Sequence, residues 1–139
     1  MNVTPYLSLN GHCAEALRFY EQVLGAKVQM KMTFGESPMA DRTPPEARDK
    51  IMHASFTVGD STIMASDGMP GATETLSGFQ LALPAKDASD AERLFGALSE
   101  GGTERMPLQE TFWAERFGML TDKFGVPWMI NYEGQKQQR

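Results

Sequence analysis

The chain has 139 residues, which is the size of one ordinary domain. Hydrophobic residues make up 41% of it and charged residues 22%, a balance typical of globular proteins and not of disordered, fibrous or disulfide-scaffold chains. The formal net charge of -5 at pH 7 opposes the basic surface that nucleic acid or an anionic membrane requires. Composition therefore predicts a folded, soluble domain that has neither nucleic acid nor a membrane as its partner.

Cysteine content and the N-terminal residues indicate the compartment. The single cysteine, Cys13, has no partner in the chain for a disulfide, a redox pair or a metal knuckle. The first residues contain neither a basic nor a strongly apolar segment, and no run of about 18 apolar residues occurs anywhere. We therefore expect a cytoplasmic protein.

The first half of the chain predicts one helix and four strands. Apolar residues recur at helical spacing between Cys13 and Leu24, with Asn10 as a suitable N-cap and Gly25 as a suitable end. One strand is expected before this helix and three after it, at residues 5–9, 26–34, 51–58 and 61–66. The dipeptide Gly59-Asp60 predicts a two-residue hairpin between the last two strands.

The segment 35–50 interrupts this pattern. It contains three prolines among several charged residues and shows no usable period. Loops of this length are uncommon in compact domains, and two interpretations remain open. The segment is either a mobile insertion or a lid over a site.

The second half repeats the order of the first. A helical stripe from Ala91 to Leu98 follows an S-x-x-E capping box that begins at Ser89, and Gly101-Gly102 ends it. The expected strands are residues 78–83 before the helix and 103–110, 113–121 and 126–132 after it. The fold class is therefore α+β, with two βαβββ modules.

The domain organisation follows from the size of these modules. A turn-rich linker at residues 67–71 joins them, and each module of about 65 residues has a marginal core by itself. We expect one domain spanning residues 1–139. Module one covers about 1–67, module two about 76–133, and the insertion is 35–50.

The predicted hairpin register sorts side chains onto two faces. Phe56 lies opposite Ile63 on an apolar face, whereas Ser55 lies opposite Met64 on a polar one. The same register places Thr57 opposite Thr62, and His53 opposite Ser66. The polar face is either an outer surface in solvent or the wall of a cleft that a concave sheet encloses.

Strand parity extends both faces over the other predicted strands. The polar side gains Tyr6, Ser8, Gln80, Met129 and Asn131. The helix side gains Leu7, Leu9, Leu81, Leu83, Trp128 and Ile130. Met64 and Met129 would give a cleft a soft, adaptable floor, which suits planar or irregular organic molecules. Equally, methionines at these positions indicate only a loosely specified core.

Four sequence motifs resemble a known family. They are TPYL at residues 4–7, FYEQVLGA at 19–26, ETFWAERFG at 110–118 and TDKFGVPWMIN at 121–131. Together they resemble PhnB-like proteins of the vicinal oxygen chelate superfamily, which includes glyoxalase I, extradiol dioxygenases and bleomycin-resistance proteins. The resemblance covers essentially the whole chain. It implies paired βαβββ modules and a homodimer.

The resemblance also implies where a metal would bind. Enzymes of this superfamily hold a divalent ion with His, Glu or Gln side chains from the first, fourth, fifth and eighth strands, and use it as a Lewis acid. Here these slots fall on Thr4 or Pro5, Met64, Phe79 or Gln80, and Met129. Only Gln80 has a suitable donor, because thioethers favour soft ions such as Cu(I). We therefore expect no glyoxalase-type metal site and no cofactor.

PhnB-like proteins are also labelled as ubiquinone-pathway methyltransferases. The chain contains no G-x-G turn after a strand, and it is too short for a doubly wound nucleotide-binding sheet. The sequence therefore gives this label no support.

Four candidate residues each have a structural alternative. His53 is either an acid, base or hydrogen-bond donor, or a hydrogen-bonded structural residue. Glu110 is either a catalytic base or a residue whose carboxylate satisfies the backbone of a turn. Trp113 is either a wall on which a ligand stacks or a residue that only packs in the core. Asp122 begins the turn Asp-Lys-Phe-Gly and is expected to be structural.

These observations predict a homodimer that binds a small organic ligand in a metal-free cleft. The predicted ligand-binding residues are Tyr6, Ser8, His53, Ser55, Met64, Ser66, Gln80, Trp113, Met129 and Asn131. Whether a reaction is catalysed stays open, with His53 and Glu110 as the candidate catalytic residues. The alternative is a metal-dependent lyase, isomerase or dioxygenase with His53, Glu110 and Gln80 as unorthodox ligands.

Overall fold

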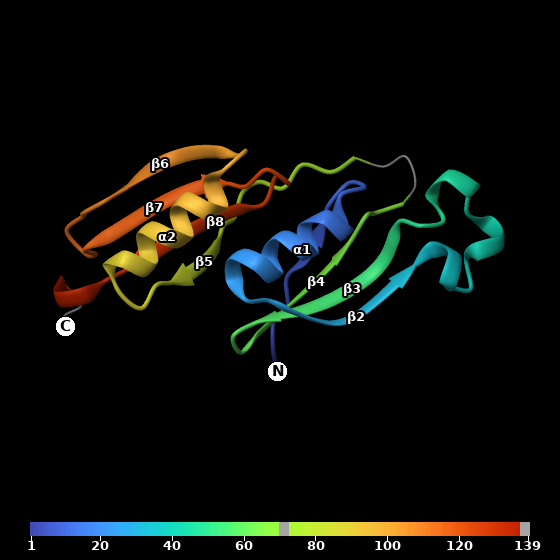
Figure 1. Ribbon diagram of the computed structural model, residues 1–139, viewed down its shortest axis with the longest axis horizontal. Helices are drawn as coiled ribbons and strands as arrows, with labels where there is room; N and C mark the ends of the chain where they lie inside the picture. The colour runs from blue at the N-terminus through green and yellow to red at the C-terminus, as the bar shows by residue number, and fades with distance from the viewer. Residues whose placement is uncertain (70–72, 137–139) are drawn as a thin grey trace. The chain divides into compact units, whose positions relative to one another are not determined.

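The computed structural model describes residues 1–69 and 73–136. The chain divides into two compact units, Met1–Thr75 and Leu76–Arg139. Each unit contains one α-helix and one four-stranded mixed sheet (Figure 1). The predicted α+β class with two βαβββ modules is confirmed. Of the predicted linker, Pro70 and Gly71 lie outside the described residues.

The first unit has the predicted order of elements. Its elements are β1 (Tyr6–Ser8), α1 (Cys13–Leu24), β2 (Lys27–Thr33), β3 (Ile51–Val58) and β4 (Ser61–Ser66). The sheet order is β1-β4-β3-β2, with β1 parallel to β4 and the other pairs antiparallel. β3 and β4 have the predicted bounds, and their ladder runs from Val58–Ser61 to Ala54–Ala65 as the hairpin register requires.

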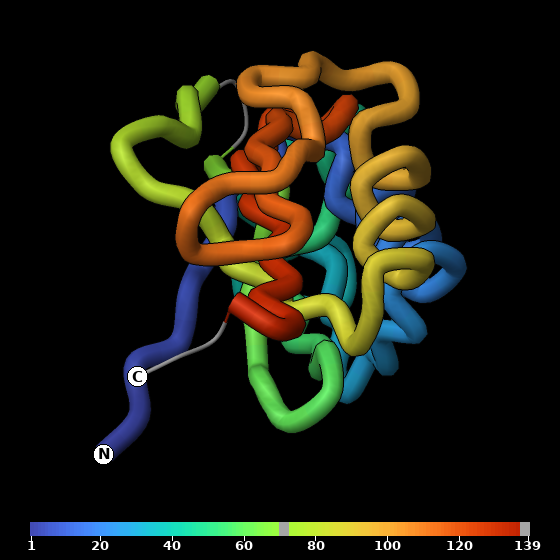
Figure 2. The backbone as a smooth tube through the Cα atoms, turned by 90° about the vertical axis from the view of Figure 1, so that its left-hand side faces the viewer, coloured from blue at the N-terminus to red at the C-terminus, as the bar shows by residue number. Residues whose placement is uncertain are grey.

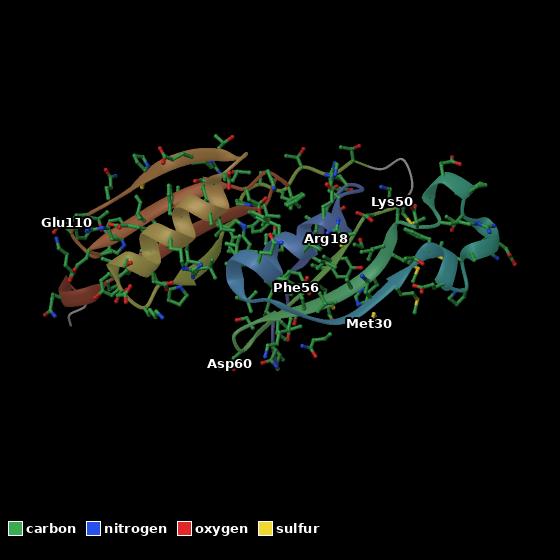
Figure 3. All side chains as sticks on the ribbon, viewed as in Figure 1. Arg18, Met30, Lys50, Phe56, Asp60 and Glu110 are labelled. Carbon is green, nitrogen blue, oxygen red and sulfur yellow. The ribbon has the colours of Figure 1, made fainter. Side chains whose placement is uncertain are left out.

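Helix α1 packs its apolar stripe on this sheet. Tyr20 is fully buried and stacks on Phe56 of β3, with ring centroids 5.8 Å apart (Figure 3). The helix ends at Gly25, whose φ of 68° is the left-handed conformation that glycine tolerates best. The prediction that Asn10 caps the helix is wrong. His12 occupies the N-cap position, and the Asn10 side chain bonds instead to the backbone of Glu74.

The segment between β2 and β3 has regular structure that its composition did not predict. It contains three short 3-10 helices, η1 (Phe34–Glu36), η2 (Ala40–Arg42) and η3 (Pro45–Ala47). Two backbone hydrogen bonds, from Phe34 N to Lys50 O and from Gly35 N to Arg48 O, close its neck. The chain therefore leaves and re-enters the sheet at nearly the same point.

The second unit repeats the arrangement. Its elements are β5 (Leu81–Pro84), α2 (Ala88–Ser99), β6 (Thr103–Gln109), β7 (Arg116–Thr121), β8 (Pro127–Tyr132) and a terminal turn η4 (Gly134–Lys136). The sheet order is β5-β8-β7-β6, and α2 lies along one side of the strands (Figure 2). β7 begins three residues later than predicted, because Thr111 and Ala114 close a turn through their backbones and the Thr111 hydroxyl.

Helix α2 begins before its predicted capping box. Asp87 is the N-cap, and its Oδ1 accepts a hydrogen bond from Asp90 N at 2.7 Å, so Ser89 lies inside the helix. The helix packs on β7 at Gly118, where a Cβ atom would lie 2.6 Å from a Phe95 ring carbon. A larger residue at this position would therefore push the helix off the sheet.

Each of the two helices has 12 residues. Within the described ranges, no helix is long enough and apolar enough to cross a membrane.

Candidate functional site

The side of the first sheet away from α1 carries a row of polar and soft side chains. Tyr6 pairs with Met64, Met64 with Ser55, and Ser55 with Met30, so the row crosses all four strands. Directly paired residues project from the same side of a sheet, and this side is opposite the one that contacts α1. A neighbouring row on the same side contains the polar side chains of Ser8, Ser66 and His53 and the thioether of Met32. These eight residues define the first helix-distal face.

Exposure differs along this face. Tyr6 is 52% exposed and Met30 is 42% exposed, at the two edges of the sheet. The central side chains of Ser55, Met64 and His53 are half-buried. The face therefore offers an amphipathic surface with hydroxyl, imidazole and thioether groups.

The phenol of Tyr6 meets the imidazole of His53 on this face. Tyr6 Oη lies 3.1 Å from His53 Nδ1, and the ring centroids are 5.6 Å apart. In the neutral tautomer that has its proton on Nε2, the phenol donates to Nδ1 and fixes the orientation of the imidazole. A fixed imidazole can exchange hydrogen bonds or a proton with a bound molecule.

Ser66 takes a structural place at the end of the face. Its hydroxyl accepts a hydrogen bond from Gly68 N at 3.0 Å, and its side chain is buried. The predicted pairing of His53 with Ser66 falls beyond the end of the ladder. Beyond the last pair, Ala54–Ala65, the backbone N–H of Asp67 donates to Ile51 O. Continuing the hairpin register would place Asp67 opposite residue 52, so this hydrogen bond is shifted by one residue.

The corresponding side of the second sheet carries a row of methionines. Met106 pairs with Met119, Met119 with Met129, and Met129 with Ala82, so the row crosses all four strands. A neighbouring row is formed by Pro84, Asn131, Phe117 and Gln109. These eight residues define the second helix-distal face, and its methionines are half-buried.

One polar atom on the second face lacks a partner. Asn131 Oδ1 is buried and accepts no hydrogen bond from any described residue. Buried amide groups are normally hydrogen-bonded, so an orphan of this kind needs a donor from water or a ligand. Sequence parity placed Asn131 on this side of β8 but did not predict the orphan atom.

The ETFW run lies at the edge of the second unit. Lys136 Nζ lies 2.7 Å from Glu110 Oε2, and this hydrogen-bonded ion pair lowers the pKa of Glu110. Thr111, not Glu110, satisfies the backbone of the turn. Trp113 is 39% exposed and packs edge-to-face on Phe117, with centroids 5.1 Å apart. The indole therefore reaches the row that contains Asn131.

The remaining candidates are distributed over both units. Gln80 is half-buried directly before β5, on the same side as Ala82 by strand parity. The structure thus brings Tyr6, Ser8, His53, Ser55, Met64 and Ser66 together on one face, and Met129, Asn131 and Trp113 together on the other.

The donor groups at the superfamily's metal slots do not suit a divalent ion. Met64 and Met129 present thioethers, which are poor ligands for hard and borderline ions. Among residues 1–69 and 73–136, no three His, Cys, Asp or Glu side chains lie close enough to hold a metal. Cys13 is an unsuitable nucleophile, because burial and the neighbouring Asp67 charge raise the pKa of its thiol to about 12.

Two buried aspartates are structural anchors. Asp122 behaves as predicted, because Oδ1 accepts hydrogen bonds from Phe124 N and Val126 N while Oδ2 accepts one from Trp128 Nε1. For Asp67 the sequence predicts only a place in the linker. Its Oδ1 accepts from Cys13 N and its Oδ2 from Ile51 N, each at 2.7 Å, so it caps α1 and fixes the start of β3.

Comparison with known proteins gives a family for the whole chain. Residues 1–131 match the family model described as 3-demethylubiquinone-9 3-methyltransferase. Protein YjdN of Escherichia coli K12 is 40% identical over 144 residues, covering 98% of each chain. Protein PA1353 of Pseudomonas aeruginosa has a crystal structure with 46% identity and a TM-score of 0.86, covering 96% of this chain and 98% of that one.

More distant structures share the fold. A Bacillus cereus structure titled putative 3-demethylubiquinone-9 3-methyltransferase, PhnB protein, superposes with a TM-score of 0.82 at 22% identity, over 95% of this chain and 99% of that one. A glyoxylase/bleomycin resistance protein/dioxygenase domain from Frankia sp. EAN1pec gives a TM-score of 0.65 at 16% identity, over 96% and 97% of the two chains.

Proposed function

The chain belongs to the PhnB-like family of the vicinal oxygen chelate superfamily, and from this premise we propose that it binds a small organic ligand without a metal ion. The supporting observation is the first helix-distal face. There one sheet surface presents the hydrogen-bonded Tyr6–His53 pair beside the thioether of Met64 and the hydroxyl of Ser55.

The chemistry of this face suits an aromatic or irregular molecule with a few polar groups. A thioether contacts aromatic rings favourably and adapts to different shapes. The imidazole and the hydroxyls supply hydrogen bonds that orient the ligand. On the second face, Trp113 offers a ring for stacking and Asn131 an unpaired amide oxygen.

A ligand screen followed by substitution tests this proposal. We expect a thermal-shift screen of aromatic and antibiotic-like compounds to give saturable ligands. Tyr6→Ala and His53→Ala should each weaken such a ligand about tenfold, which corresponds to about 1.4 kcal/mol of lost contacts. Tyr6→Phe removes only the hydroxyl, so comparing it with Tyr6→Ala separates the contribution of the hydroxyl to ligand affinity from that of the ring. Gln22→Ala, on the exposed side of α1, is the matched control and should bind normally.

Two outcomes would contradict the proposal. The first is a ligand whose affinity is the same in Tyr6→Ala, His53→Ala and Gln22→Ala, because binding would then take place elsewhere. The second is catalytic turnover of a compound without any saturable binding by the screened classes.

The metal-dependent alternative has a separate test. A lyase, isomerase or dioxygenase using His53, Glu110 and Gln80 requires a bound divalent ion. Elemental analysis of protein purified without chelator, with a thermal-shift titration of divalent metals, distinguishes the two functions. Stoichiometric metal with a clear shift would favour the alternative, and loss of that shift in His53→Ala would identify a ligand.

A further inference from the structure

A cavity of about 340 Å³ lies at the N-terminal end of α1, entirely within the first unit. Its walls come from the turn before α1, the 3-10 segment and the chain after β4. Phe34, Ala47 and Asp67 are its buried lining residues, and Glu46 is an exposed one. Lys50, which is labelled in Figure 3, also lines the cavity and is exposed. The cavity shares no lining residue with the first helix-distal face.

The carboxylate of Asp67 is the buried charged group of this cavity. Its side chain is only 7% exposed, and each oxygen accepts one backbone hydrogen bond, from Cys13 N and Ile51 N. Each carboxylate oxygen has capacity for a further donor. Within the described residues, no Lys, Arg or His forms a salt bridge with Asp67. Buried carboxylates are usually paired with a cation, although the positive end of α1 compensates part of this charge.

Two side chains of the cavity wall that carry donors, Lys50 and Asn10, are oriented by hydrogen bonds to the backbone. Lys50 Nζ donates to Gly11 O at 3.0 Å. The Asn10 amide donates to Glu74 O at 2.7 Å and accepts from Glu74 N at 2.8 Å. The lining contains two carboxylates, of Asp67 and Glu46, and a single ammonium, of Lys50, so acceptors and negative charge are in excess. A complementary ligand carries donors and a positive charge.

We propose that this cavity binds a primary organic ammonium with a compact apolar body. The ammonium donates to the Asp67 carboxylate, with Glu46 at the margin of the site, and the apolar body packs on Phe34 and Ala47. The volume is at the small end of the range for ligand sites, so it suits a molecule of about ten non-hydrogen atoms. The site is separate from the ligand-binding face proposed above.

Three probes of similar size and different charge test the ligand class. Nuclear magnetic resonance titrations of the labelled full chain at neutral pH use 2-phenylethylamine, 2-phenylethanol and phenylacetate. We expect saturable shifts of the amide signals of Gly11, Ala47 and Gly68 with the amine, weaker shifts with the alcohol and none with the acid. Equal or tighter binding of the acid or the alcohol, or no saturable binding of the amine, would overturn the proposal.

Charge substitutions at the exposed margin test the site itself. Glu46→Gln should weaken the amine about fivefold, and Lys50→Met should tighten it about threefold, because each changes one partly screened charge. Asp41→Asn and Lys27→Met make the same charge changes at exposed positions outside the cavity and are the controls. Effects of the same size in the controls, tighter binding in Glu46→Gln, or weaker binding in Lys50→Met would contradict the proposal.

A further variant separates the two proposed sites. Tyr6→Ala should leave the amine titration unchanged, because Tyr6 does not line the cavity. Weakened amine binding in Tyr6→Ala would place the amine on the first helix-distal face and overturn the separate site.

Discussion

Among single residues, Asp67 and Asp122 each satisfy several donors with one buried carboxylate. The donors of Asp122 lie within six residues of it, so the local Asp-Lys-Phe-Gly pattern predicted its turn. The donors of Asp67 lie 54 and 16 positions away in the sequence. No local pattern indicates such partners, and the sequence around Asp67 therefore predicts only a linker.

We expect Asp67→Asn to destabilise the chain by about 3 kcal/mol, because an amide nitrogen would replace one charged acceptor and leave a buried N–H unpaired. Urea unfolding measures this loss. Asp41→Asn, on an exposed turn, is the matched control and should stay within about 0.5 kcal/mol of the parent. A loss below about 1 kcal/mol for Asp67→Asn would show that its two hydrogen bonds are easily replaced.

The Glu110–Lys136 pair predicts a pH effect at one residue. Because the hydrogen bond and the charge of Lys136 stabilise the carboxylate, the pKa of Glu110 is below its ordinary value of 4.5. Its stabilising contribution is present above the unfolded pKa and is lost as the pH falls through the folded one. Carboxyl-carbon magnetic resonance should show the pKa rising toward 4.5 in Lys136→Met. An unchanged value would mean that the pair does not persist in solution.

At the scale of elements, the hairpin was predictable and the helix starts were not. Gly59 and Asp60 determine the β3–β4 ladder locally, and β3 and β4 have the predicted bounds. For α2, Asp87 accepts from Asp90 N while Asp90 accepts from Lys86 N, so two carboxylates satisfy two backbone donors. This reciprocal pair favours the earlier start over the box beginning at Ser89.

The segment 34–50 is held by contacts that proline and charge content do not indicate. Ser37 is buried, and its hydroxyl donates to Phe34 O at 2.7 Å and accepts from Met39 N at 3.0 Å. Thr43 is also buried and donates to Met39 O at 2.8 Å. These hydrogen bonds join residues close in sequence within the segment, so they would hold its shape in either interpretation, a mobile insertion or a lid.

We expect Ser37→Ala to loosen this segment, because it removes both side-chain hydrogen bonds from a buried turn. Limited trypsin digestion should then cleave after Arg42 and Arg48 about fivefold faster, which corresponds to about 1 kcal/mol less resistance to local opening. Ser61→Ala, at the exposed end of the hairpin, should digest at the parent rate. Rapid cleavage of the parent at these two sites would show that the segment is already open.

At the scale of the whole molecule, the two units repeat one arrangement with different chemistry. Met64 and Met129 occupy equivalent places, each on the strand that pairs in parallel with the first strand of its unit. Strand parity was enough to place both residues on helix-distal faces. It was not enough to predict the Tyr6–His53 contact, which joins side chains of two strands that are not neighbours in the sheet, or the orphan oxygen of Asn131.

The family resemblance predicts a homodimer, and one exposed aromatic makes this testable. Phe112 is 89% exposed in the single chain and packs on Trp113, itself 39% exposed, with ring centroids 4.8 Å apart, so the two rings form an exposed aromatic patch. Sedimentation velocity should give the mass of a dimer, and Phe112→Asp should raise its dissociation constant at least about tenfold. Lys123→Asp, on another exposed turn, controls for added charge. A monomer at all concentrations would contradict the prediction.

The hydrogen bond from Cys13 N to Asp67 has a consequence for the order of folding during synthesis. The residues of α1 are made early, but the carboxylate that caps the helix is made 54 residues later. Until Asp67 has left the ribosome and met both Cys13 and Ile51, the first turn of α1 lacks its cap and frays. We therefore expect α1 to reach its full stability only when nearly all of the first unit has been translated.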